Sequence, residues 1–141
     1  MTDLIDWSEK LVSSIEWQLV PVDMTVDDCV PFIVEAIEFF YIMSGDALRY
    51  SDDLVITDEE AGTVMFDRDF KVDERQYILT TAMILFYQKV QSDVNELMSY
   101  TTDAMSVANA DKPFANLAGM IDNLKERQLM IWHKMTRYNL L

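Results

Sequence analysis

Residues that interrupt regular secondary structure are scarce in this chain. Its 141 residues include only three glycines and three prolines, while half of all residues are hydrophobic. A chain of this length usually folds as one domain with a substantial core. With so few breakers, long helices are favoured over the many turns that an all-β fold needs. We therefore expect a mainly helical fold.

The spacing of the apolar residues predicts about four helices in a small bundle. In each segment they recur every three or four positions, which places them on one helical face. Thr25 and Ser44-Gly45 suit the two caps of the second helix, and Pro113 suits the first turn of the last. Thr101–Asp111 is small and polar and predicts a loop. The expected helices cover residues 5–19, 25–43, 72–98 and 113–137, the last with an apolar stripe of Phe114, Leu117, Ile121, Leu124, Met130 and Met135.

Between the second and third helices the pattern becomes β-prone. Leu54–Thr57 and Thr63–Phe66 are short runs rich in β-branched and apolar residues, separated by the acidic segment Asp58–Gly62. This arrangement predicts a β-hairpin inserted between the two helices. Because an isolated hairpin is barely stable, it must pack on the helices or pair with another chain. We expect a single domain over residues 1–141, with a protruding hairpin at residues 52–67.

The charge of the chain is large and unevenly distributed. Residues 1–70 contain 17 acidic and three basic residues and carry the whole net charge of −14, whereas residues 71–141 contain eight of each. An acidic surface argues against ordinary DNA binding, which depends on neutralising phosphates. The asymmetry predicts different surroundings for the two halves, although acidity also serves solubility alone.

Residues with catalytic or metal-binding chemistry form no recognisable site in the sequence. Cys29 and His133 are the only cysteine and histidine, which excludes an internal disulfide and a His-rich or Cys-rich metal site. We expect Cys29 in the core and His133 on the surface of the last helix. The glycines are isolated, so no phosphate-binding loop is present. The sequence predicts no enzyme activity, no catalytic residue, no metal and no cofactor.

Several segments have the character and the order found in one protein family. They are Phe39–Tyr41, Asp67–Phe70, the apolar helix through Tyr77–Leu85, a polar segment with Ala108-Asn109, and Met135–Tyr138. Together they extend over residues 25–141 and resemble the head–tail connector proteins of tailed bacteriophages, also called adaptor or head-completion proteins. The first expected helix lies outside this resemblance.

The resemblance implies a structural protein of the virion neck, synthesised in the host cytoplasm. Such subunits form a ring, usually of about twelve copies, under the portal protein. The ring extends the DNA channel and receives a head-closure or tail-completion protein, and DNA passes through without specific binding. No membrane contact is expected. By this analogy the tail at residues 132–141 meets the portal through Trp132, Lys134, Arg137, Tyr138, Leu140 and Leu141, and the acidic hairpin residues Asp58, Glu59 and Glu60 face the channel or the next ring.

Two other classes of function stay open. The first is an inhibitor or regulatory binding protein that mimics nucleic acid with its acidic surface, which predicts a monomer or dimer. The second is an enzyme that uses paired carboxylates, such as Asp27-Asp28, Asp52-Asp53 or Glu59-Glu60. It predicts loss of activity when Asp52 or Asp67 is changed to Asn, but a hydrated acidic surface is the favoured interpretation of these pairs.

Overall fold

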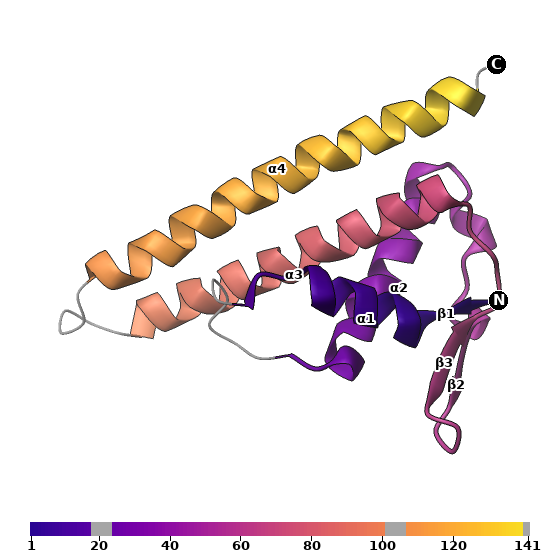
Figure 1. Ribbon diagram of the computed structural model, residues 1–141, viewed down its shortest axis with the longest axis horizontal. Helices are drawn as coiled ribbons and strands as arrows, with labels where there is room; N and C mark the ends of the chain where they lie inside the picture. The colour runs from indigo at the N-terminus through magenta and orange to yellow at the C-terminus, as the bar shows by residue number, and fades with distance from the viewer. Residues whose placement is uncertain (18–23, 101–106, 140–141) are drawn as a thin grey trace.

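A computed structural model describes residues 1–17, 24–100 and 107–139, with side-chain environments for residues 1–17, 24–93 and 117–136. Within these ranges lie four α-helices and a small antiparallel sheet with strand order β1-β3-β2 (Figure 1). The expected mainly helical fold, with a hairpin between the second and third helices, is confirmed. The elements are β1 (Thr2–Asp3), α1 (Leu4–Ser14), α2 (Val26–Met43), β2 (Val55–Asp58), β3 (Thr63–Phe66), α3 (Val72–Tyr100) and α4 (Val107–Asn139), with single 3-10 turns at Ala47–Arg49 and Asp52–Leu54.

Both ends of α2 follow from its own sequence. Thr25 and Asp28 form a capping box, in which the Asp28 N–H donates to Thr25 Oγ1 at 3.3 Å and the Thr25 N–H donates to the Asp28 carboxylate at 3.0 Å. At the other end Gly45 has φ +79°, and the Asp46 N–H donates to the Tyr41 carbonyl at 2.9 Å. A left-handed glycine with this hydrogen bond is the usual way to close a helix. The predicted caps are confirmed.

The predicted extent of the first helix is wrong, because α1 ends at Ser14 and Ile15 is already extended. The hydroxyls of Ser13 and Ser14 both donate to the Lys10 carbonyl, at 2.8 and 2.9 Å. Such side-chain bonds offer the backbone an alternative to further helix. Trp17 then donates its indole N–H to the Val12 carbonyl at 3.1 Å, which supplies a partner for one of the last carbonyls. Leu19, the predicted end, lies outside the described residues.

Two predictions for the last helix also need correction. The helix begins at Val107, so Val107–Asp111 is helical rather than loop, and Pro113 falls inside the helix instead of near its start. The rest of the predicted loop lies outside the described residues. The predicted apolar stripe includes Met130, but this residue is 71% exposed. Gln128 faces α3 instead, where its side-chain amide donates to the Thr81 hydroxyl at 2.7 Å.

The strand β1 has no counterpart among the predicted elements. It pairs antiparallel with β3, where Thr2 lies opposite Phe66 and Asp3 opposite Met65. The Thr2 hydroxyl adds a 2.7 Å hydrogen bond to the Arg68 carbonyl. The start of the chain therefore joins the hairpin to the helical body, which meets the expectation that the hairpin needs a partner surface.

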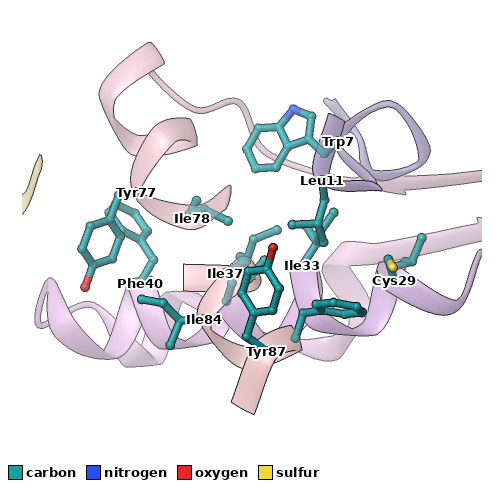
Figure 2. Close-up of a cluster of buried hydrophobic side chains, with 14 of the residues drawn as sticks. Trp7, Leu11, Cys29, Ile33, Ile37, Phe40, Tyr77, Ile78, Ile84 and Tyr87 are labelled. Atoms are coloured by element: carbon teal, nitrogen blue, oxygen red, sulfur yellow. The ribbon is translucent and has the colours of Figure 1, made fainter. Parts of the chain in front are cut away.

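The helices converge on one core in which α3 lies between α4 and the pair α1–α2 (Figure 1). Figure 2 shows Leu11 of α1, Ile33 and Ile37 of α2 and Ile78 of α3 directed into the same region. Cys29 is fully buried there, as predicted for a core residue. Burying a Leu or Ile side chain contributes roughly 1.5–3 kcal/mol, so the apolar residues of this cluster supply much of the folding free energy.

Aromatic side chains extend this core towards the sheet and α4. Phe70, in the segment between β3 and α3, has its ring centroid 5.5 Å from Trp7, 5.7 Å from Phe66 and 6.2 Å from both Phe40 and Tyr41. It therefore contacts α1, α2 and β3 at once. Aromatic pairs at such spacings stabilise by about 0.5–1.5 kcal/mol beyond their buried area.

We expect Phe70→Ala to lower the free energy of unfolding by about 3 kcal/mol, the low end for a buried Phe, because Phe70 is only half-buried. Urea unfolding followed by circular dichroism measures the change. Phe39→Ala is the matched control, because Phe39 is 38% exposed and should change stability by only about 0.5 kcal/mol. Equal effects of the two substitutions would contradict the central role of Phe70.

A second prediction concerns the polar contact between α3 and α4. The Thr81 hydroxyl donates to the Tyr77 carbonyl at 2.9 Å and accepts from Gln128. Thr81→Val leaves the Gln128 amide without its partner and should destabilise the fold by about 1 kcal/mol. Adding Gln128→Leu should recover most of this loss, because an apolar pair replaces both polar groups. A double-mutant cycle in urea measures the coupling, and purely additive effects would contradict it.

Candidate functional site

The tip of the β2–β3 hairpin is an exposed acidic surface that projects away from the helices (Figure 1). Asp58, Glu59 and Glu60 are all exposed. The Asp58 carboxylate accepts the N–H groups of Glu60 at 3.1 Å and Ala61 at 3.2 Å, so it helps to form the turn. Among the described side chains no base lies within 4 Å of the Glu59 and Glu60 carboxylates. These two are the groups best able to meet a partner.

An acidic groove separates the hairpin from α2. Asp27, Glu35 and Glu38 of α2 line one side, and Asp52 lies on the other. Tyr50 sits in this groove and donates its hydroxyl to the Asp52 carboxylate at 3.2 Å. Burial, followed by this hydrogen bond, raises the pKa of Tyr50 to about 12. The phenol therefore stays neutral beside the acids and acts as a donor.

The C-terminal part of α4 presents a mixed apolar and basic face. Lys134 is exposed, as are Leu129 at 55% and Met130 at 71% of their surface. Trp132 is half-buried, with its ring 5.4 Å from Tyr77 of α3. Much of the Trp132 side chain is thus used within the molecule. Of the other predicted contact residues, Arg137 and Tyr138 fall within α4 with side chains outside the described set, and Leu140 and Leu141 lie outside the described residues.

A cleft of about 580 Å³ lies between the C-terminal end of α2, the segment before α3, and α4. Its apolar wall consists of aromatic and Met side chains from three parts of the chain. Its rim carries three bases, Arg49, Arg68 and Lys71. The size falls within the roughly 300–1,000 Å³ typical of ligand sites. The apolar residues lining it are Phe40, Tyr41, Phe70, Trp132 and Met135.

Most of the acids around this cleft already take part in an ion pair or a hydrogen bond. Asp69 lies 2.6 Å from the amino group of Met1, and Glu74 accepts the backbone N–H of Lys71 at 2.8 Å. Asp46 lies 3.9 Å from Arg49, a long and exposed pair that stabilises little.

Two bases of the cleft form no ion pair with the described side chains. Among the side chains that the structure describes, Arg68 and Lys71 have no carboxylate within 4 Å, and Arg68 Nε is buried without a hydrogen-bond partner. What the cleft offers an incoming carboxylate is thus the Arg68 guanidinium and the Lys71 ammonium beside an aromatic wall. The lining as a whole is not positive, because it also contains the acids Asp46, Asp69, Asp73 and Glu74.

The remaining reactive groups lie apart from this cleft. Burial, and then the charge of Asp28, raises the pKa of Cys29, so its thiol stays protonated in the core. His133 is exposed on α4, as expected. Within the described ranges no three His, Cys, Asp or Glu side chains gather as a metal site, and no helix there is long and apolar enough to cross a membrane.

Comparison of the chain with protein-family models, with curated proteins and with solved structures finds no significant match. The cleft itself was not predicted from the sequence. Arg49 lies in the 3-10 turn after α2, whereas Arg68 and Lys71 lie in the segment between β3 and α3, and only folding brings the two parts together. One signal was available, because Lys10, Arg49 and Arg68 are the only bases in the first 70 residues and two of these three line the cleft.

The paired acids near α2 give a prediction with a defined pH dependence. Backbone and side-chain hydrogen bonds with Thr25 lower the pKa of Asp28 below its ordinary value of 3.8. A depressed pKa stabilises the fold above pH 3.8, and this contribution disappears as pH falls through the folded-state pKa. Asp28→Asn should therefore destabilise the protein near neutral pH and lose its effect in acid. Urea unfolding across pH tests this, with Asp27→Asn as the control that should change stability little. A loss of unfolding free energy in Asp28→Asn that stays the same at every pH would contradict the prediction.

Proposed function

We propose that this protein is a structural virion protein, a head–tail connector (adaptor) subunit that assembles as a ring of about twelve copies under the portal. The ring would extend the DNA channel and join the capsid to the neck or tail. The observation that most supports this proposal is the contrast between an acidic hairpin tip and an apolar, basic face on α4. Rings require contacts between different patches of one subunit, and a chain with two unlike surfaces supplies them.

The C-terminal part of α4 is the proposed portal contact. Exposed Leu129 and Met130 are apolar groups of the kind that interfaces cover, and Lys134 adds a positive charge. The tail beyond them, with Arg137 and the terminal leucines, continues this mixture in sequence. Trp132 would contribute only its exposed edge, because Tyr77 covers part of it.

The acidic first half of the chain is compatible with a DNA channel. Residues 1–70 carry a net charge of −14. DNA that must slide through a channel should not be held by its phosphates, and acidic walls repel them. This role requires neither catalysis nor a bound cofactor, so we propose that the protein is not an enzyme and holds no cofactor.

The test is electron microscopy with mass determination on the chain alone and with the portal protein encoded beside its gene. We expect a ring of about a dozen subunits docked on the portal. A chain ending at Thr136 keeps the buried Met135 and the Trp132–Tyr77 contact, so it should fold but bind the portal at least tenfold more weakly. Lys134→Glu should also weaken binding.

Lys125→Glu is the matched control, because Lys125 is exposed on α4 nine positions earlier and should leave portal binding unchanged. A monomer or dimer that ignores the portal and binds a nucleic-acid enzyme would replace the connector proposal with the nucleic-acid mimic. Portal binding that survives both the truncation and Lys134→Glu would refute the assignment of the α4 face.

A further inference from the structure

We propose that the acidic hairpin tip of one subunit inserts into the Arg68–Lys71 cleft of a second copy of this chain. The inference rests on the proposed ring and names the contact between its neighbouring subunits. It would take the place of the channel-facing position that the resemblance suggests for the hairpin.

The cleft offers a carboxylate two bases that form no ion pair with the described side chains. Arg68 and Lys71 have no carboxylate within 4 Å, and Arg68 Nε is buried without a hydrogen-bond partner. The Arg49–Asp46 pair at 3.9 Å is weak enough to exchange partners. A guanidinium binds a carboxylate through two parallel hydrogen bonds, which is stronger and more specific than a single point charge. A partner segment that covers the cleft would displace water from between these bases and the aromatic wall, which strengthens an ion pair formed there.

The hairpin tip is matched to the cleft. Glu59 and Glu60 are exposed and are the tip carboxylates that the turn itself does not use. The turn is fixed by the Asp58 hydrogen bonds and by Gly62 at φ +67°. A preformed turn loses little entropy when it binds, so more of the electrostatic attraction remains as affinity.

The two surfaces lie on different sides of one subunit. The hairpin projects away from the body on the side opposite α4 (Figure 1). The cleft, in contrast, is lined in part by Trp132 and Met135 of α4. A tip therefore meets the cleft of another copy, whose own tip stays free for a third. This head-to-tail contact generates a closed ring when its rotation closes.

Charge reversal tests the contact directly. Glu59→Lys with Glu60→Lys makes the tip basic, and Arg68→Glu with Lys71→Glu makes the cleft acidic. Each variant alone should self-associate at least tenfold more weakly than the original chain, because like charges then meet. Mixed in equal amounts, the two variants should assemble again, since each reversed surface meets its complement. Sedimentation and mass determination, on the chains alone and on the portal, measure assembly.

Glu9→Lys with Glu16→Lys is the matched control, with the same change of charge at exposed positions in and just after α1. It should assemble normally. If the Arg68 variant fails to fold by circular dichroism, Arg49→Glu with Lys71→Glu replaces it, because both side chains are exposed. Assembly should also weaken strongly near 1 M salt, where the screening length is about 3 Å.

The outcomes separate this contact from the connector role. Charge-reversed variants that assemble like the original chain, or an original chain that never contacts another copy even on the portal, overturn the inference. If the variants form normal rings on the portal, the proposed contact is wrong and the connector proposal stands. If the mixture restores assembly but nothing binds the portal, the contact is supported and the connector proposal fails.

Discussion

The aromatic contacts of Phe70 hold together parts of the chain that would otherwise be separate. Phe70 lies in an irregular segment, yet it contacts Trp7 of α1 and Phe66 of β3. It also contacts Phe40 and Tyr41 near the end of α2. From Phe40 the same cluster continues through Tyr77 to Trp132 of α4, with ring separations of 5.9 and 5.4 Å. A sheet as small as this one is not stable alone. Its attachment to the helices depends on this cluster.

The same cluster also borders the cleft. The cleft lies at the corner where α2 ends, α3 begins and α4 passes, and rings of the cluster line it. The segment before α3 must cross this corner, and it carries Arg68 and Lys71 to the rim. The rings that stabilise the fold therefore also form the wall of the proposed binding site, and stability and recognition share residues here.

Local signals predicted the parts of the fold that depend on local physics. Thr25, Asp28 and Gly45 act on backbone groups within five residues of themselves, so the ends of α2 were readable. The strand β1 was missed because its partner is more than 60 residues away and two residues carry no periodicity. Gln128 was left out of the stripe because its suitability depends on Thr81, which only the packing of α3 on α4 reveals. The cleft was unpredictable for the same reason.

The pairing of β1 with β3 also affects the order in which the nascent chain can acquire structure. The carbonyl that the Thr2 hydroxyl binds belongs to Arg68, 66 residues later. At roughly 5–20 residues per second, the ribosome needs about 3–13 s to make that stretch. During this interval α1 can form its turns, but the apolar face with Leu4 and Trp7 lacks the sheet and Phe70. The packing of β1 and α1 is thus completed late, although these residues are synthesised before their partners.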